Sequence, residues 1–317
     1  MTDEKIVCCG GGVIGASWAF YFSLKGHNVI VYDISDDALE RAKNSVEHCI
    51  AGMKSFGVID DAASAVIREK IAYTIDPKIA FSDATMIQEN VPEQMDVKQN
   101  TLALIEKYAP NDCLYASSTS GMPITDIAAK AKHPERCIGS HPFNPPHLMP
   151  LVEITKGEKT EQQYIDRAVK FYHSIGKEPV VLQKEKIGFI ANRLQHVILR
   201  ESMSLVAEGV CTVPEIDRAL IYGVGLRWAS VGAVMTGELG SANGIRESNE
   251  KFHKLNEMIF QDIENRQLVP ENWGEVAEKG VADEFDSNPD FMGHNRQEVA
   301  DFRDHVLVEL LKLHHKL

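Results

Sequence analysis

The chain is short of basic side chains, and this excludes the partners that need them. Its 33 lysines and arginines face 46 aspartates and glutamates, which gives a formal net charge of −13 over 317 residues. Nucleic acids and anionic membrane surfaces attract proteins through basic patches. The charge balance therefore argues against both as main partners.

Long apolar runs and disulfide patterns are also missing. Glycines interrupt the one N-terminal stretch that approaches the length of a membrane span, and this stretch lacks the basic head and small-residue cleavage site of a secretion signal. The six cysteines show no CxxC spacing, and several lie in expected buried strands; they are Cys8, Cys9, Cys49, Cys113, Cys137 and Cys211. These absences predict a reduced, cytoplasmic protein without a disulfide framework.

What is present fits a globular protein with two domains. The hydrophobic content of 44% and charged content of 25% are ordinary, and 317 residues suffice for two cores. In the first half, β-rich runs alternate with helical patterns. We expect strands within residues 5–10, 28–33, 71–76, 84–91, 113–118, 136–141 and 178–183, and helices at 13–25, 95–108 and 124–132, with two more between 36 and 70 that break at Gly57. This alternation predicts an α/β fold with a parallel, doubly wound sheet.

From residue 188 onward nearly every segment has helical spacing. Residues 189–210 are expected to form one long buried helix, and the amphipathic run 299–313 offers either interface surface or a core-facing stripe. We therefore expect an all-helical second domain in residues 187–317, with the boundary near Lys186.

A glycine-rich loop follows the first expected strand. In "CCGGGVIG", Gly10, Gly12 and Gly15 have GxGxxG spacing between a strand and a helix, with Val13 and Ile14 between the last two glycines. Such glycines allow a tight turn, a close approach of backbone to pyrophosphate, and close packing of helix on strand. The loop predicts a dinucleotide site in a Rossmann-type domain of residues 1–186; the alternative is a structural glycine-rich turn.

The second expected strand ends at Asp33, eighteen positions after Gly15. A carboxylate at this place can accept both hydroxyls of the adenosine ribose. It repels a 2′-phosphate, and no arginine follows it directly, so we predict NAD rather than NADP. FAD uses the same loop, but the sequence has no further flavin-specific feature.

The stretch "CIGSHPFNPPHLMPLVEI", residues 137–154, predicts a strand, a proline-stiffened loop and a second strand. His141 then ends one strand, and Glu153 lies twelve positions on within the next. A hydroxyl can pass its carbon-bound hydride to NAD only if a base removes its proton, and a carboxylate on the other imidazole nitrogen fixes the tautomer. We predict a catalytic dyad; a solvated or core-satisfied histidine and a buried ion-pair glutamate are the alternatives.

These motifs, together with "SSTSG" and "GFIANR", resemble those of the L-3-hydroxyacyl-CoA dehydrogenase superfamily, in order, over about residues 5–240. The resemblance implies that His141 is the base and that Glu153 orients it. It also implies that Ser120 and Asn192 hydrogen-bond the reacting oxygen. Taken alone, Ser120 would be a cap or turn hydroxyl and Asn192 a helix-start amide.

The resemblance places three further residues at the cofactor. Asn144 matches a motif asparagine near the nicotinamide, and Glu93 and Lys98 match positions on the nicotinamide side. On their own, Glu93 and Lys98 would be a solvated helix start. No metal is expected, because the nearby histidines lack ligand spacing and no cysteine joins them.

Residues 222–234, "YGVGLRWASVGAV", are similar to the branch that oxidises free hydroxy acids, which includes L-gulonate 3-dehydrogenases (the lambda-crystallin relatives) and L-carnitine dehydrogenases. Arg227 offers a two-pronged clamp for a free carboxylate, and Trp228 can close over an apolar or cationic substrate end. The alternatives are an ion pair of Arg227 with the other domain or with a dimer partner, and a core position for Trp228.

The segment between residues 36 and 70 carries seven acidic and five basic residues. It is a poor cradle for the phosphates of coenzyme A unless the fold brings Lys43 and Lys54 together. We therefore predict NAD-dependent oxidation of a short free L-3-hydroxy acid, of the L-carnitine or L-gulonate type, to the 3-keto acid. The alternatives are an L-3-hydroxyacyl-CoA dehydrogenase and a non-catalytic, crystallin-like NAD-binding protein. The helical domain is expected to pair subunits into a homodimer.

Overall fold

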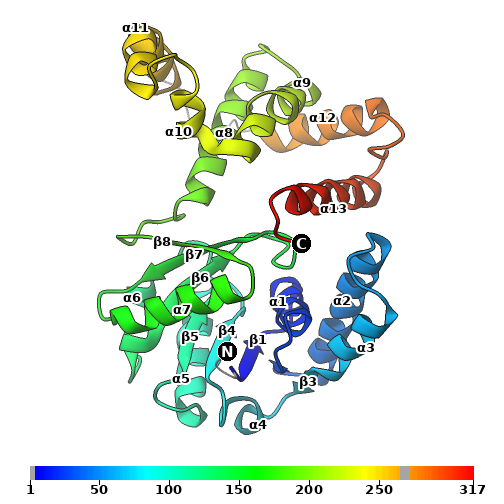
Figure 1. Ribbon diagram of the computed structural model, residues 1–317, viewed down its shortest axis with the longest axis vertical. Coiled ribbons are helices and arrows are strands. Elements are labelled where there is room, and N and C mark those ends of the chain that lie inside the picture. The colour runs from blue at the N-terminus through cyan, green and yellow to red at the C-terminus, as the bar shows by residue number, and fades with distance from the viewer. Residues whose placement is uncertain (1–3, 265–271) are drawn as a thin grey trace. The chain divides into compact units, whose positions relative to one another are not determined.

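The computed structural model describes residues 4–264 and 272–317, which form two compact units (Figure 1). The first unit comprises residues 4–192 and Arg303–Leu317, and the second comprises Arg193–Phe302. We expected all residues after Lys186 to belong to the helical domain. The structure instead places Arg303–Leu317 in the first unit. Their helix α13 (Arg296–Leu313) returns to the first unit because Val308 and Leu311 are buried in its core.

The first unit is built on one eight-stranded sheet with the order β3-β2-β1-β4-β5-β6-β7-β8. The strands are β1 (Ile6–Cys9), β2 (Val29–Tyr32), β3 (Ile71–Thr74), β4 (Met86–Glu89), β5 (Leu114–Ser117), β6 (Cys137–Pro142), β7 (Leu151–Lys156) and β8 (Glu178–Val181). All neighbours pair in parallel except β6 and β7. Chain progression reverses between β1 and β4, and such switch points open a crevice at the carboxyl ends of the strands. The predicted Rossmann-type sheet is confirmed.

Helices cover both faces of this sheet. They are α1 (Val13–Leu24), α2 (Asp36–Ser55), α3 (Asp61–Glu69), α4 (Pro77–Phe81), α5 (Met95–Tyr108), α6 (Ile124–Ile127) and α7 (Gln162–Ser174). One core cluster unites α1, α2, α3 and α7 with the sheet, and the other unites α4, α5 and α6 with it. Ser35, Asp60 and Asp76 accept backbone hydrogen bonds where α2, α3 and α4 begin, so polar caps fix these helix starts.

One expectation for this unit needs correction, and one helix was missed. The helix expected over residues 124–132 ends at Ile127, because the following backbone closes three-residue turns, from Ala129 to Asp126 and from Ala131 to Ala128. Helix α7 was not expected. Its buried residues Ile165, Ala168, Phe171 and Tyr172 nevertheless recur at helical spacing.

The second unit contains α9 (Val213–Ala219), a π-helical segment (Leu220–Gly225), α10 (Leu226–Glu238), α11 (Ile245–Glu264) and α12 (Trp273–Ser287), and α8 (Ala191–Ala207) leads into it. A helix was expected over residues 189–210, but its predicted burial is wrong. Within this single chain Leu194 is 62% exposed and Val197 56% exposed, because other described segments leave this apolar face of α8 uncovered. Among the described residues, no helix is both long and apolar enough to cross a bilayer.

Candidate active site

The glycine-rich loop joins β1 to α1, and each glycine has its own geometric reason. Gly10 has φ +94°, and a Cβ there would lie 2.9 Å from the carbonyl of Asn90. A Cβ on Gly15 would lie 1.8 Å from the Gly10 oxygen, so only glycine lets α1 approach the strand. Gly12 faces open space and begins α1 without a side-chain cap. The first turn of α1, from Val13 and Ile14 onward, is therefore open to a phosphate group, as NAD requires.

Asp33 follows β2 directly, at the same edge of the sheet. Its Oδ2 accepts the backbone N–H of Gly11 at 2.8 Å, and its Oδ1 accepts that of Ile34 at 2.7 Å. These bonds fix the carboxylate beside the glycine-rich loop. Each oxygen keeps a further lone pair, so the carboxylate can still receive two ribose hydroxyls. The residues present thus fit the adenosine half of NAD.

His141 and Glu153 face each other across the antiparallel pair of β6 and β7. They are direct partners in the β6–β7 register, and His141 Nδ1 lies 2.9 Å from Glu153 Oε2. Glu153 Oε1 accepts the backbone N–H groups of Ile190 and Ala191 at 2.8 and 2.9 Å. The Glu153 side chain is only 1% exposed. Burial alone would raise the pKa of this carboxyl, but hydrogen bonds from His141 and from the two backbone groups outweigh it and hold the pKa below its usual range.

Two aromatic rings enclose the imidazole. The ring centroid of His141 lies 5.3 Å from that of Phe143 and 5.5 Å from that of Phe189, both edge to face. Phe189 is a non-glycine residue with φ +51°, an unfavourable backbone conformation that the fold imposes. Because Nδ1 donates to Glu153, Nε2 is the nitrogen with a free lone pair. The arrangement therefore presents His141 as a base in a fixed tautomer.

Ser120 and Asn192 also meet, although 72 positions separate them. Ser120 lies in the loop after β5 and is exposed, and Asn192 is the second residue of α8. The Asn192 side-chain amide donates to the Ser120 carbonyl at 3.1 Å. Asn144 lies exposed in the loop that follows His141. Ser120 and Asn144 follow the carboxyl ends of β5 and β6, the edge that also carries the glycine-rich loop and Asp33.

Glu93 and Lys98 belong to a buried charge cluster. Lys98 is 1% exposed, so the alternative of a solvated helix start is wrong for it. Its ammonium lies 3.0 Å from Glu89 and 3.3 Å from Glu93. Burial raises the pKa of Glu93, but a hydrogen bond from Thr119, the charge of Lys98 and the Ser120 backbone N–H together leave it lowered. The sequence analysis did not single out Glu89. The feature that could have indicated it is an acidic residue at the end of a strand whose other residues are all expected to be buried.

Arg227 and Trp228 lie at the start of α10 in the second unit, where both are exposed. The structure thus assigns them to the other unit from His141 and Glu153. Their proposed contact with substrate stays a prediction.

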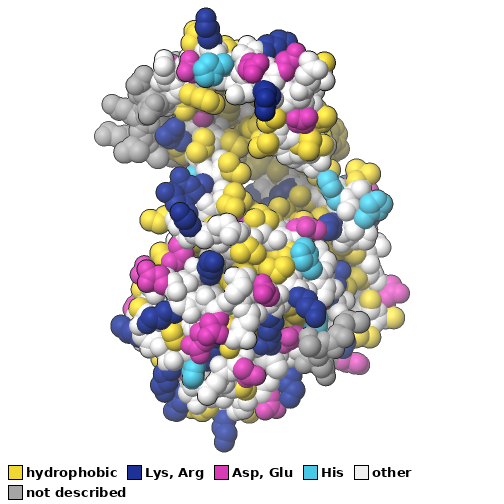
Figure 2. Space-filling model, turned by 60° about the vertical axis from the view of Figure 1, so that its left-hand side comes forward, with side chains coloured by type: hydrophobic (Ala, Val, Ile, Leu, Met, Phe, Trp, Pro, Cys, Tyr) yellow, Lys and Arg dark blue, Asp and Glu magenta, His cyan; other side chains and the backbone are white. Residues whose placement is uncertain are grey.

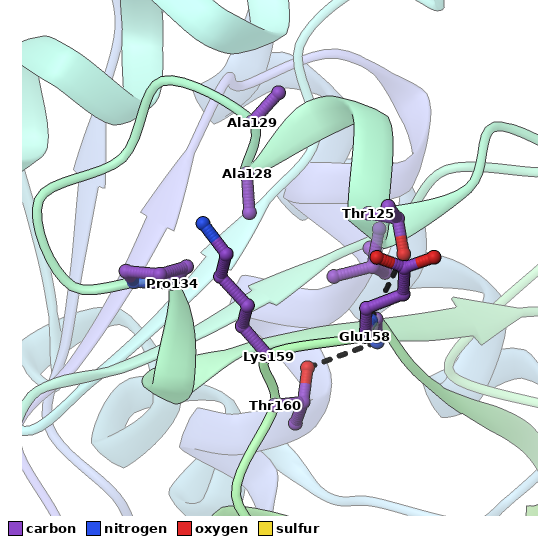
Figure 3. A pocket seen from close by; sticks show the side chains of 9 residues that line it. Thr125, Ala128, Ala129, Pro134, Glu158, Lys159 and Thr160 are labelled. Carbon is purple, nitrogen blue, oxygen red and sulfur yellow. Dashed lines mark hydrogen bonds between the residues drawn. The ribbon is translucent and has the colours of Figure 1, made fainter.

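A pocket of about 200 Å³ lies between α6 and the turn after β7 (Figure 3). None of the predicted site residues lines it. Both threonines that line it already bond to the protein: Thr125 donates to Glu185 and accepts the Glu158 backbone N–H, and Thr160 donates to the Cys137 carbonyl. We therefore interpret it as a structural hollow.

Comparisons with known proteins agree with this geometry. Residues 5–186 match the family described as 3-hydroxyacyl-CoA dehydrogenase, NAD binding domain, and residues 188–283 match its C-terminal domain. L-carnitine dehydrogenase of Oceanobacillus iheyensis is 36% identical over 269 residues, or 84% of this chain and 86% of that protein. The enzyme of the same name from Bacillus cereus is 34% identical over 98% of this chain and 92% of its own length. A 3-hydroxyacyl-CoA dehydrogenase of Gibberella moniliformis is 32% identical, covering 100% and 97%.

Solved structures show the same fold. The crystal structure of 5-formyl-3-hydroxy-2-methylpyridine-4-carboxylic acid 5-dehydrogenase, an NAD⁺-dependent dismutase, superimposes with a TM-score of 0.79 at 28% identity, covering 99% of this chain and 98% of that one. The 3-hydroxybutyryl-CoA dehydrogenase of Escherichia coli gives a TM-score of 0.69 at 26% identity, covering 89% and 57%. The predicted cofactor and enzyme class are confirmed. The chain belongs to the 3-hydroxyacyl-CoA dehydrogenase family of NAD-dependent oxidoreductases.

Proposed function

We propose that the protein oxidises the 3-hydroxyl group of a short free L-3-hydroxy acid, of the L-carnitine or L-gulonate type, to the 3-keto acid. The observation that carries this proposal is the buried contact of 2.9 Å between His141 and Glu153, which leaves one imidazole nitrogen available as a base. Two of the similar proteins named above are L-carnitine dehydrogenases, and they match this chain over most of its length.

His141 Nε2 removes the hydroxyl proton as the carbon–hydrogen bond at C3 breaks. NAD, when bound, supplies the acceptor for the departing hydride. The alcohol loses two electrons and becomes a ketone, and the proton on His141 passes to water. Glu153 stays ionised at neutral pH because its pKa is lowered, and so it stabilises the imidazolium that forms.

The remaining residues bind and orient. Ser120 and Asn192 hold the reacting oxygen by hydrogen bonds, and Asn144, Glu93 and Lys98 border the nicotinamide. Asp33 binds the adenosine ribose and selects NAD over NADP. The assignments of Asp33, Glu93, Ser120 and Asn144 are supported by their positions after the carboxyl ends of parallel strands, at one edge of the sheet. Those of Asn192 and Lys98 are supported by their contacts with Ser120 and Glu93.

The charges on α2 and α3 favour a free acid over a coenzyme A thioester. Lys43 lies 3.3 Å from Glu40, Lys54 pairs with Asp61, and both Arg68 Nε and Nη2 lie 2.6 Å from Glu47. Such exposed ion pairs add little stability. Each of them, however, places a carboxylate next to a lysine or arginine that would have to bind a phosphate of coenzyme A. On one face of the described residues, acidic and basic side chains are interspersed rather than gathered by sign (Figure 2). Arg227 is the proposed partner for the free carboxylate, and Trp228 for the other substrate end.

The competing substrate is a 3-hydroxyacyl-CoA, since a relative of that name matches the whole chain. Purified protein should be assayed with NAD and L-carnitine, L-gulonate, L-3-hydroxybutyrate or 3-hydroxybutyryl-CoA, following NADH absorbance. We expect turnover with a free acid to exceed turnover with the thioester. A preference for the thioester would contradict the substrate assignment. NAD binding without turnover of any compound would favour a non-catalytic role.

We further propose that the protein is a homodimer. Large apolar side chains on α8, α10 and α11 are exposed in the single chain: Leu194, Val197, Val234, Met235, Leu255, Met258 and Phe260. Apolar surface on this scale favours burial against another subunit. Light scattering after gel filtration should give the mass of two chains, and a stable monomer would refute the proposal.

A further inference from the structure

Glu89, the last residue of β4, lies at the centre of a buried network of hydrogen bonds. Glu89 is 0% exposed and pairs in register with Cys9, the last residue of β1, at the switch point of the sheet. Its Oε1 accepts from the Val91 backbone at 2.8 Å, and its Oε2 accepts from Tyr115 at 2.9 Å and Ser117 at 2.6 Å. A buried carboxylate with this many donors is held in one position.

Lys98 connects this carboxylate to a second one. Its ammonium donates to both oxygens of Glu89, at 3.0 and 3.2 Å, and lies 3.3 Å from Glu93 Oε2. Lys98 and Glu89 are both buried, whereas the Glu93 side chain is 42% exposed. Of the two carboxylates that share the ammonium, Glu93 is therefore the one with room to move.

Glu93 in turn holds the loop after β5. Its Oε1 accepts from the Thr119 hydroxyl at 2.6 Å and from the Ser120 backbone N–H at 2.8 Å. A continuous chain of charged contacts thus runs from the switch point of the sheet to the backbone of Ser120. Glu89, at one end of this chain of contacts, is buried and held by several donors. Glu93, next to the Ser120 backbone, is partly exposed to solvent.

We propose that Glu89 is a positioning residue that acts through Lys98 and Glu93 to fix the backbone of Ser120. Glu89 shares the charge of Lys98, so the ammonium stays between the two carboxylates. Without that charge, Lys98 has only Glu93 as a counterion, and Glu93 is drawn away from the Ser120 amide. The consequence for catalysis rests on the proposed function, in which Ser120 holds the reacting oxygen.

The direct test is amide hydrogen exchange at Ser120 in the full chain, compared between wild type and Glu89→Gln. Losing one acceptor should speed exchange of this amide about tenfold, the equivalent of one hydrogen bond. Glu4→Gln is the matched control, because Glu4 is also buried and pairs with Arg167 at 2.8 Å. Glu4 precedes β1 at the opposite strand end. Unchanged Ser120 exchange in Glu89→Gln, or an equal rise in Glu4→Gln, would overturn the proposal.

If Glu89→Gln does not fold, the double variant E89Q/K98M, which removes both buried charges, is measured instead. Without the ammonium nothing draws Glu93 away, so exchange at Ser120 should stay at the wild-type rate, and a tenfold rise would overturn the proposal. Activity gives an independent readout where a hydroxy acid is turned over. Glu89→Gln should lower kcat about tenfold in the wild type and have little further effect in a Ser120→Ala background, since contacts in one chain are not additive. Equal losses in both backgrounds would also overturn it. Absence of turnover in the wild type would refute the proposed function alone, because amide exchange needs no substrate.

Discussion

The two oxygens of Glu153 have separate partners, and this division decides what the residue can do. Oε2 receives His141, and Oε1 receives the backbone of Ile190 and Ala191. The carboxylate is thus held by the segment that starts α8 as well as by its own strand. The facing of His141 and Glu153 was predictable, because prolines fixed a strand-loop-strand. The backbone donors were not, since they lie 37 and 38 positions away in the chain.

Replacing Glu153 with glutamine should lower kcat about 100-fold, because it weakens His141 as a general base, and a well-placed base usually contributes at least that factor. Glutamine keeps the size of the side chain but has no charge to stabilise the imidazolium. The NAD dissociation constant, measured by fluorescence titration, should stay nearly unchanged. Glu158→Gln, in the exposed turn after β7, is the control and should keep wild-type kcat. Equal activity of the two variants would remove Glu153 from the mechanism.

Asp33→Arg should shift the cofactor preference from NAD toward NADP. The change removes an acceptor for two ribose hydroxyls and adds a positive charge for a 2′-phosphate, so we expect KM for NAD to rise about tenfold or more. Steady-state kinetics with both cofactors measures this. Asp33→Asn keeps the size of the side chain and should have a smaller effect. A constant ratio of NAD to NADP efficiency in Asp33→Arg would refute the ribose role.

At the scale of elements, most strands and helices were predictable from periodicity, and their environment was not. β1, β4 and β5 are wholly buried runs, as central parallel strands require. The burial of Lys98 could not be predicted, because its partner Glu89 lies on the strand before its helix. The exposed apolar face of α8 carries the pattern of a buried helix, and periodicity does not say which molecule covers it.

A buried lysine, Lys177, holds the β6–β7 loop by hydrogen bonds to its backbone. Lys177 donates to the carbonyls of Pro146 and Met149, the latter at 2.9 Å, and lies 3.8 Å from the ring centroid of Tyr21 in α1. The loop is also tied to α1 through His147, whose Nδ1 lies 2.8 Å from the Ser17 hydroxyl and whose backbone N–H donates to that hydroxyl at 3.0 Å. The segment that carries His141 is therefore anchored to the helix that begins at the glycine-rich loop.

This anchor should make stability depend on pH through His147. Burial, and then the charges of Lys177, His48 and Arg303, lower its pKa to about 4. In the unfolded chain the value is about 6.5, so between pH 6.5 and 4 the unfolded state binds more protons. Stability contributed by neutral His147 is therefore complete above pH 6.5 and falls as the pH drops toward 4, by at most about 3 kcal/mol.

Chemical denaturation at pH 7 and pH 4.5 measures this dependence. His147→Gln should lose less stability between the two values than the wild type does. His173→Gln, at an exposed position in the last turn of α7, is the control and should keep the wild-type dependence. An unchanged pH dependence in His147→Gln would contradict the assignment.

For the whole molecule, the sequence correctly indicated a sheet domain and a helical region, but not that the end of the chain returns to the sheet unit. Val308 and Leu311 join the core that also contains Trp18 and Ile50, more than 250 positions earlier in the chain. Such long-range packing leaves no trace in local periodicity. The first unit supplies the cofactor loop and the dyad, and substrate selection is the role proposed for Arg227 of the second unit.

Arg227→Met tests that role. Methionine keeps much of the length of the arginine side chain and removes its charge, so KM for a free hydroxy acid should rise about tenfold or more, as expected for a lost charge-assisted hydrogen bond. KM for a matching thioester, which has no carboxylate at that place, should change much less. Arg246→Met, in the exposed first turns of α11, is the control for a surface arginine of the same unit. Equal changes with the acid and the thioester would show that Arg227 supports the structure rather than the substrate, and the carboxylate would then need another partner.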